Sequence, residues 1–202
     1  MARTQAADYE ERRDLIVEKA AKLYAERGFL GASIADLAKA CRTSKSLIYH
    51  YYPSKEDILF DVMHSHVRQL LDITDDIIAK PWPGEEKLRT LTQAFMKHYV
   101  GAAARHKVLL NELDRLPKER RATIIDIQRR MIDAIQKILG DIRPELRAQA
   151  ALKWPAVMLY FGMINWTHTW MRANGAAKPQ RIAELAANVF LNGLVEAQIP
   201  KG

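Results

Sequence analysis

Apolar residues recur three and four positions apart along nearly the whole chain, which is the spacing of one face of an α-helix. No segment alternates apolar and polar residues in the way a half-buried strand does. Glycine and proline interrupt the helical pattern at Gly28, Pro53, residues 80–84, Pro117 and Gly140, and both residue types commonly end helices. The pattern therefore predicts an all-α protein with about nine helices.

These interruptions also indicate where each helix begins and ends. A chain of 202 residues is long enough for one well-buried core, or for a small head on a larger body. We expect helices at about 9–27, 33–40, 44–50, 54–79, 88–102, 108–113, 118–139, 144–173 and 179–198.

Residues 33–55 carry the strongest local signals in the chain. Ser33 with Asp36 fits a capping box, in which each side chain satisfies a backbone N–H, and Ser54 with Asp57 fits a second one. Between them, residues 41–43 form a tight turn that separates two short helices. This is the helix-turn-helix plan, in which the second helix lies in the major groove of DNA.

The outward residues of this segment suit a nucleic acid. From Lys39 to Lys55 the sequence has four basic residues and no acidic one, with several hydroxyl and imidazole groups among them. Such groups bind phosphate oxygens, and short polar side chains reach base edges. The alternative is an ordinary solvated helix pair, which the agreement of capping, turn length and polarity disfavours. The predicted DNA-binding residues are Ser33, Arg42, Thr43, Ser44, Lys45, Ser46, Tyr49, His50, Tyr51 and Lys55.

Residues 12–63 resemble the DNA-binding domain of the TetR family of bacterial transcriptional regulators. The resemblance rests on ERGF at the end of the first helix, ASIADLA at the start of the next, then SKSLIYHYY and PSKEDIL. It implies an all-helical homodimer with a variable C-terminal domain that binds a small molecule. This chain departs from the pattern at Arg42, where similar proteins often have glycine, and at Thr43, which replaces an apolar residue. If the turn needs a positive φ, an arginine there costs on the order of 1 kcal/mol.

The resemblance and the helix pattern together predict three segments. Residues 1–8 are expected to be a flexible tail, residues 9–54 the helix-turn-helix DNA-binding domain, and residues 55–202 the effector-binding and dimerisation domain. The helix at 54–79 is then the covalent link between head and body, and the resemblance implies that it sets the separation of two heads in a dimer.

Charge and cysteine usage narrow the setting of the protein. The formal net charge is +7, which suits a polyanionic partner, but the first 60 residues are nearly balanced, so the DNA argument is local. The single cysteine, Cys41, cannot form an internal disulfide. The sequence shows no signal peptide and no apolar run long enough for a bilayer. We therefore expect a cytoplasmic, nucleoid-associated bacterial protein with no membrane partner.

A dimer face is predicted in the C-terminal part of the chain. The stretch 144–173 is apolar on more than one side, so it needs both a core face and a partner face, and small residues in 179–198 allow close approach. The alternative is that both stretches fill one monomeric core. The predicted interface residues are Trp166, Trp170, Ile182, Leu185, Val189 and Gly193.

An effector site is predicted from polar residues on otherwise apolar helices. A few polar groups converging on an apolar cavity are typical of small-molecule sites, although each one alone also fits a satisfied buried hydrogen bond. We expect a small hydrophobic effector and no other cofactor. The basic run at 115–121 would suit an acyl-coenzyme A thioester, and a solvated basic turn is the alternative reading. The predicted ligand-binding residues are Phe95, Tyr99, Asn111, Met131, Met158, Phe161, Asn165 and His168.

An enzyme is not supported by the sequence. The six histidines form no H-E-x-x-H pattern, one cysteine cannot build a zinc site, and neither a phosphate-binding glycine loop nor a nucleophile motif is found. We expect no catalytic residue and no metal site. The function predicted is a ligand-responsive regulator that binds a palindromic operator as a dimer, with repression as the family's default. The rival is an architectural DNA-binding protein without an effector.

Overall fold

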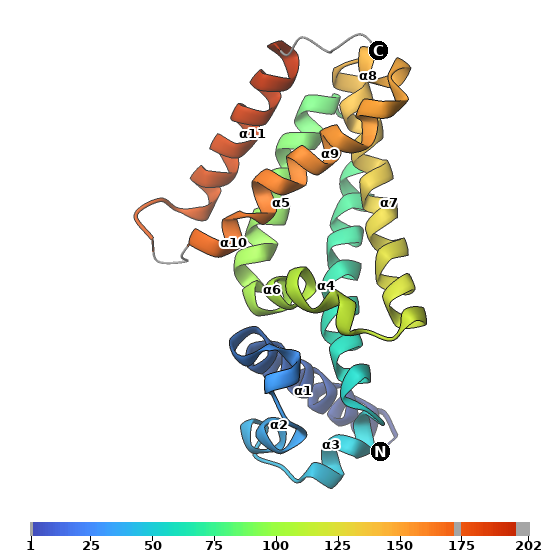
Figure 1. The fold of residues 1–202 in the computed structure, drawn as a ribbon, viewed down its shortest axis with the longest axis vertical. Coiled ribbons are helices and arrows are strands. Elements are labelled where there is room, and N and C mark those ends of the chain that lie inside the picture. Colours follow the sequence, from blue (N-terminus) through green and yellow to red (C-terminus); the bar gives the residue numbers. More distant parts are fainter. Residues whose placement is uncertain (1, 172–174, 197–202) are drawn as a thin grey trace. The chain divides into compact units, whose positions relative to one another are not determined.

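The computed structural model describes residues 2–171 and 175–196, leaving out the side chains of 2–7 and 195. Within these ranges every regular element is a helix, so the predicted all-α class is confirmed (Figure 1). The helix count is higher than expected because one long predicted helix is interrupted. The elements are α1 (Ala2–Gly31), α2 (Ile34–Ala40), α3 (Lys45–Tyr51), α4 (Lys55–Ile78), α5 (Gly84–Gly101), α6 (Ala103–Glu112), the 3₁₀ helix η1 (Leu113–Arg115), α7 (Lys118–Ile142), α8 (Glu145–Ala148), α9 (Ala150–Asn165), α10 (Thr167–Trp170) and α11 (Pro179–Glu196).

The chain forms two compact units, each built from two segments. The head unit comprises Met1–Val67 with Ala102–Ile125, and the body unit comprises Arg68–Gly101 with Asp126–Gly202. The predicted domains divide instead after residue 54. The head unit extends beyond the predicted DNA-binding domain because α6 packs on α1. In addition, the buried rings of His66 on α4 and His106 on α6 hydrogen-bond at 3.1 Å and so join these two helices.

Helix α1 supplies much of the core of the head unit. It begins at Ala2, so residues 2–8, for which the sequence predicts a tail, lie in the helix, while residue 1 is outside the described residues. Its apolar face, with Ile16, Ala20 and Tyr24, is buried. The predicted stop at Gly28 is confirmed locally, because Gly28 has a non-helical φ of 73° and turns the chain before Phe29.

The body unit is organised around the buried face of α5, which carries Leu88, Leu91 and Phe95. Helix α11 packs against α5 and α9. Helix α7 continues to Ile142, so the predicted stop at Gly140 is wrong. Gly140 is instead a contact point, because a Cβ there would lie 2.9 Å from Cγ of Arg147.

The single helix expected over residues 144–173 is three helices in the structure, with breaks at Gln149 and Trp166. Gln149 has a φ of −106° and a ψ of 81°, which is outside the helical region. The chain before it is tied down on two sides, since Arg147 pairs with Asp141 and Arg143 donates to the carbonyl of Leu194 at 2.9 Å. Residues 172 and 173 of the predicted helix lie outside the described residues.

Candidate DNA-binding site and effector region

The start of α2 is fixed by the predicted capping box. Oγ of Ser33 accepts a hydrogen bond from the N–H of Asp36 at 3.0 Å, and Oδ2 of Asp36 accepts one from the N–H of Ser33 at 3.0 Å. The hydroxyl of Ser33 also donates to the same carboxylate, and this bond holds the pKa of Asp36 below its ordinary value. The Ser33 side chain therefore already serves the fold at the exposed end of α2.

The turn after α2 is a Schellman motif, the common helix ending in which one residue takes a left-handed conformation. The N–H of Thr43 donates to the carbonyl of Ala38 at 2.9 Å, and the N–H of Arg42 donates to that of Lys39 at 3.1 Å. Arg42 is the left-handed residue, with a φ of 54°, and among the described residues it is the one non-glycine with a positive φ. The turn therefore does need a positive φ at residue 42. Because this residue is an arginine and not a glycine, its backbone is strained.

Helix α3 presents a polar face and buries an apolar one. Oγ of Ser44 accepts from the N–H of Leu47 at 3.1 Å and so caps the helix where the sequence predicted its start. Ile48 is fully buried beneath it. Of the ten predicted DNA-binding residues, seven are exposed and three, Thr43, Tyr51 and Lys55, are half-buried; the exposed ones are Ser33, Arg42, Ser44, Lys45, Ser46, Tyr49 and His50.

A polar cluster that the sequence did not reveal anchors the end of α3. The hydroxyl of Tyr52 donates to Asp61 at 2.6 Å and accepts from Nε of Arg13 at 3.2 Å, and Arg13 pairs with Asp61 at 2.9 Å. Burial, and then the Asp61 carboxylate, raise the pKa of the Tyr52 hydroxyl, so it keeps its proton. The three residues lie on α1, at the C-cap of α3 and on α4. Their partners are distant in sequence, so no local motif marks them.

The ammonium group of Lys55, which the sequence predicts to bind a phosphate, contacts another part of the protein. Its ammonium donates to the carbonyl of Phe29 and lies 4.1 Å from the centroid of the Phe29 ring. Burial lowers the pKa of Lys55, although the neighbouring carboxylates of Glu56 and Glu112 act in the opposite direction. The structure therefore gives Lys55 an internal role, and a phosphate contact from it stays a prediction.

The predicted effector residues are placed unevenly. Phe95, Tyr99 and Met131 are buried in the body unit, where the Phe95 ring lies 6.1 Å from that of Tyr99 and 6.3 Å from that of Phe161. Met158, Phe161, Asn165 and His168 are half-buried in the same unit. Asn111 is instead exposed on α6 in the head unit, and its amide donates to the carbonyl of Lys107 in the same helix.

One polar atom among these residues points to unused hydrogen-bonding capacity. The side-chain oxygen of Asn165 is buried and has no hydrogen-bond partner among the described residues. A buried oxygen without a partner costs about 1–3 kcal/mol. A ligand with a donor group would offset that cost.

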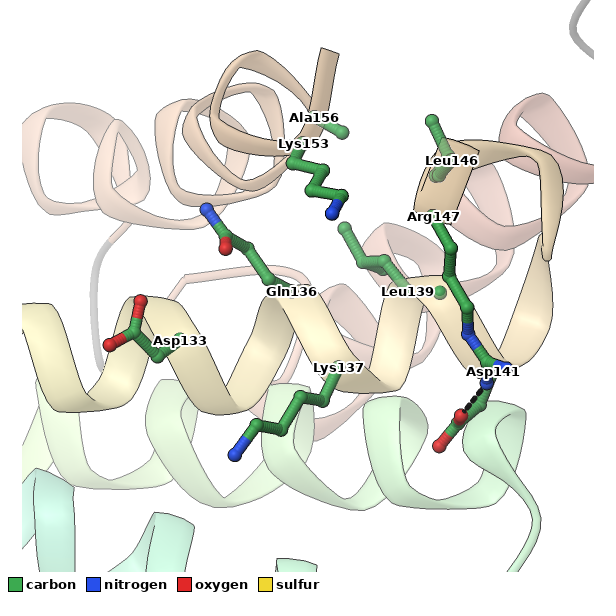
Figure 2. A pocket seen from close by; sticks show the side chains of 10 residues that line it. Asp133, Gln136, Lys137, Leu139, Asp141, Leu146, Arg147, Lys153 and Ala156 are labelled. Carbon is green, nitrogen blue, oxygen red and sulfur yellow. Dashed lines mark hydrogen bonds and ion pairs between the residues drawn. The ribbon is translucent and has the colours of Figure 1, made fainter. Parts of the chain in front are cut away.

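A cavity of about 580 Å³ lies between α7, α8 and α9 in the body unit. Figure 2 shows Lys153 and Gln136 directed into it, next to Leu139. None of the eight predicted effector residues lines this cavity, and no sequence motif marks it, because its walls come from three helices. Its lining residues are Asp133, Gln136, Lys137, Leu139, Gly140, Asp141, Leu146, Arg147, Lys153 and Ala156.

The basic run at 115–121 is largely compensated by acidic side chains. Arg120 pairs with Asp57 and stacks on the Phe60 ring, and Arg121 pairs with Asp114 at 3.0 Å. Two further arginines after it are also paired. Local neutralisation of this kind weakens its attraction for an anionic ligand. The remaining pairs are Arg115 with Glu112, Arg129 with Asp126 and Arg130 with Asp75.

Large apolar side chains are exposed on α9, α11 and the segment around α10. Trp166 is 65% exposed, and Leu185 and Val189 are 63% and 58% exposed. Trp170 and Gly193 are also exposed, and Ile182 is half-buried. A Cβ placed on Gly193 would meet nothing within 4 Å. The six predicted interface residues are therefore accessible in the single chain.

Two features are absent from the described residues. None of their helices is both long and apolar enough to cross a membrane. No three His, Cys, Asp or Glu side chains in the described ranges are grouped so that they could hold a metal ion.

Comparisons with known proteins agree with this architecture. A family model described as "Tetracyclin repressor-like, C-terminal domain" matches residues 81–194, and one described as "Bacterial regulatory proteins, tetR family" matches residues 16–62. The crystal structure of a TetR-family transcriptional regulator from Bordetella parapertussis 12822 is 36% identical to this chain, with a TM-score of 0.87. That match covers 93% of this chain and 98% of the regulator.

Two more distant relatives cover nearly the full length. The HTH-type transcriptional repressor KstR2 of Mycobacterium tuberculosis (strain ATCC 25618 / H37Rv) is 23% identical over 199 residues, which are 95% of this chain and 96% of the repressor. AibR, solved in complex with isovaleryl coenzyme A and operator DNA, is 23% identical with a TM-score of 0.78 over 88% of this chain and 97% of AibR. At that identity the AibR comparison shows the fold alone.

The capped α2, the left-handed turn and the outward polar face of α3 define a helix-turn-helix DNA-binding protein. One family model covers this helix-turn-helix, and the other covers most of the remaining chain, so the two together assign most of the protein to one family. The chain belongs to the TetR family of bacterial transcriptional regulators, a family of DNA-binding proteins that are not enzymes.

Proposed function

We propose that this regulator represses transcription by binding a palindromic operator as a homodimer, and that a small hydrophobic effector releases it from the operator. The observation that carries the proposal is the face formed by Arg42, Lys45, Ser46, Tyr49 and His50, which is exposed on a capped helix pair. Cationic and hydroxyl groups on such a helix hold phosphates and read base edges in the major groove.

The exposed apolar surface supports the homodimer. Soluble monomers rarely expose contiguous apolar patches larger than a few hundred Å². Tryptophan is enriched among the residues that dominate interface energetics, and two exposed tryptophans, Trp166 and Trp170, belong to this surface. We expect Trp166→Asp to raise the dimer dissociation constant by at least about thirty-fold. Sedimentation velocity measures this directly. Leu30→Asp is the matched control, because Leu30 is 72% exposed but lies in the head unit. A Trp166→Asp protein that remains as dimeric as the control would refute this interface.

A dimer also explains how two heads can read one operator. Helix-turn-helix dimers bind half-sites about 34–36 Å apart, one turn of the duplex. Helix α4 runs from the head unit into the body unit, so its two halves belong to different compact units. We infer that an effector in the body unit changes the course of α4 and thereby the separation of the heads. This requires an effector that binds the two states with different affinity.

The effector class is a proposal that rests on the buried aromatic residues and on relatives. AibR was solved with isovaleryl coenzyme A, so a short acyl-coenzyme A thioester is the first compound class to test. The apolar surroundings of Phe95 and Phe161 suit an acyl chain, and the partnerless oxygen of Asn165 suits a donor group. The paired arginines at 115–121 argue against a strong contribution from that run.

Two experiments test the proposed function. Selection from random duplexes followed by footprinting should yield a symmetric protected site, and one effective compound should remove the protection. Calorimetry should then show acyl-coenzyme A binding more tightly than the free acid. Equal binding of both would refute a role for the coenzyme's phosphates. A symmetric footprint that no compound disturbs would favour the architectural DNA-binding protein instead.

The cavity between α7, α8 and α9 is a second place to seek the effector. Lys153 points into it next to Leu139, and a cation beside an apolar side chain suits an anionic head group on an apolar body (Figure 2). Lys153→Met should weaken binding if the effector lies there, and Phe161→Ala should weaken it if the effector lies among the aromatic residues.

We further propose that the protein acts at the nucleoid in the bacterial cytoplasm, where its operator would be.

A further inference from the structure

The helix-turn-helix segment is closed at its base by a contact between its two ends. Phe29 lies just before α2, and Lys55 lies in the first turn of α4, just after α3. The Lys55 ammonium donates to the Phe29 carbonyl and lies over the Phe29 ring, 4.1 Å from its centroid. The residues between them, including the whole of α2 and α3, therefore form a loop whose ends are held together by one lysine.

A residue from α6 holds the other side of the same phenylalanine. Oε1 of Glu112 accepts a hydrogen bond from the Phe29 N–H at 3.1 Å. The N–H is turned out of the α1 ladder because Gly28, with a φ of 73°, breaks the helix immediately before it. A Cβ at Gly28 would lie 3.3 Å from the same Glu112 oxygen, so a glycine is suited to this approach.

The hydrogen bonds that Phe29 forms with Lys55 and with Glu112 each have one ionised partner. Phe29 itself is only 4% exposed, and the Glu112 side chain is 16% exposed. Hydrogen bonds in which one partner is ionised are about twice as strong as neutral ones. The opposite charges of Glu112 and Lys55 also attract each other across the Phe29 backbone. The three residues come from α1, α4 and α6, which all belong to the head unit.

We propose that Glu112 and Lys55 are positioning residues for DNA binding, which act by clamping the Phe29 backbone and so fixing the orientation of α2 and α3. In this scheme α6, which lies 50 residues or more beyond the helix-turn-helix in sequence, is part of the DNA-binding unit. The proposal rests on DNA binding by the α2–α3 face. It assigns Lys55 to the clamp and not to a phosphate.

The direction in which operator affinity changes when Glu112 is replaced distinguishes the clamp from a purely electrostatic effect. Removing the negative charge of Glu112 would by itself strengthen attraction to DNA. Loss of the clamp weakens binding instead. Glu112→Ala should lower operator affinity about ten-fold, the usual scale for one hydrogen bond to a charged group. Glu112→Gln keeps an acceptor for the Phe29 N–H and should stay within about three-fold of wild type.

The test measures affinity by fluorescence anisotropy on the operator obtained by selection, over a range of salt concentrations. Glu26→Ala is the matched control, because it removes one exposed carboxylate from α1 of the same unit. Lys55→Met keeps the side-chain stem over the Phe29 ring. It should weaken binding without changing the salt slope, whereas a lost phosphate contact would lower the slope by about 0.9 per subunit. Glu112→Ala binding as tightly as Glu26→Ala, or a lowered slope in Lys55→Met, would overturn the proposal.

Amide hydrogen exchange of the wild-type protein tests the clamp without DNA and without a variant that must fold. The Phe29 amide should exchange far more slowly than an unbonded amide, because its hydrogen bond must open first. Exchange at the unprotected rate would overturn the clamp even if every Glu112 variant failed to fold. A protected Phe29 amide in a protein that selects no duplex would leave the clamp intact and count against the proposed function.

Discussion

Replacing Arg42 by glycine should make the protein more stable and its binding to DNA weaker. Arg42 occupies the left-handed position of the turn between α2 and α3, with a φ of 54°. A side chain in that conformation costs about 1–2 kcal/mol, and glycine avoids the cost. Glycine also gives the unfolded chain more freedom, which offsets about 0.5–1 kcal/mol of the gain. The net increase in the free energy of unfolding should be about 0.5–1 kcal/mol.

Urea titrations at a fixed protein concentration measure this difference, since the stability of a dimer depends on concentration. Arg42→Ala is the matched control. It also removes the guanidinium but keeps a side chain at the positive φ, so it should bring no gain in stability. If Arg42→Gly is no more stable than Arg42→Ala, the turn does not hold residue 42 in the left-handed region and the reasoning fails.

The same two variants test the role of the guanidinium in DNA binding. The Arg42 side chain is exposed and forms no hydrogen bond or ion pair with the other described residues. If each subunit of a dimer places it on a phosphate, both variants should lower the salt slope by about 1.8 in all. Anisotropy titrations at several salt concentrations measure the slope. Slopes equal to that of the wild type would exclude a phosphate contact from Arg42 while leaving the stability argument untouched.

Two further predictions concern stability. Thr92→Val should cost about 1–3 kcal/mol in urea unfolding, because the buried Tyr160 hydroxyl, 3.1 Å from Oγ1 of Thr92, would lose its partner. Thr92→Ser should be close to wild type, and a Val variant as stable as the Ser variant would contradict the role of this bond. Asp36→Asn should be less stable than wild type at neutral pH, with the difference shrinking as the pH falls below the ordinary carboxyl pKa of 3.8. The sign follows because the bond from Ser33 lowers the pKa of Asp36 in the folded state, so its contribution is lost as that carboxylate takes up a proton. Urea titrations from about pH 7 to about pH 3 measure the difference, and a constant one would contradict the assignment.

Local features of this protein could be predicted from the sequence because their partners are only a few residues apart. The Ser33 and Ser44 caps each join residues three apart, and the Schellman turn needs only residues 38–43. Helical spacing of apolar residues similarly predicted the helix at 88–102, which corresponds to α5 (Gly84–Gly101). Such contacts depend on backbone geometry that a short segment can adopt by itself. The all-α fold and the helix-turn-helix could therefore be predicted from the sequence.

Several residues lie in surroundings that their local sequence does not indicate, because the packing of the helices decides those surroundings. Lys55 stands in a helix first turn, which suits phosphate binding, but its ammonium binds a carbonyl 26 residues earlier. Gly140 was expected to end a helix, yet α7 runs past it to Ile142, and a Cβ at Gly140 would lie 2.9 Å from Cγ of Arg147. Asn111 looked like a pocket residue, and the structure places it on an exposed face of α6.

The sequence by itself thus determined that the described chain is helical, where the capping box of α2 lies and where the recognition helix begins. The tertiary structure decided that α6 belongs to the head, since the Phe29 N–H meets the Glu112 carboxylate across 83 residues. It also decided that the tryptophan surface is exposed and where the cavity lies. The physical reason is that helix periodicity shows that a face must be buried or covered, whereas the choice of partner depends on how distant helices pack.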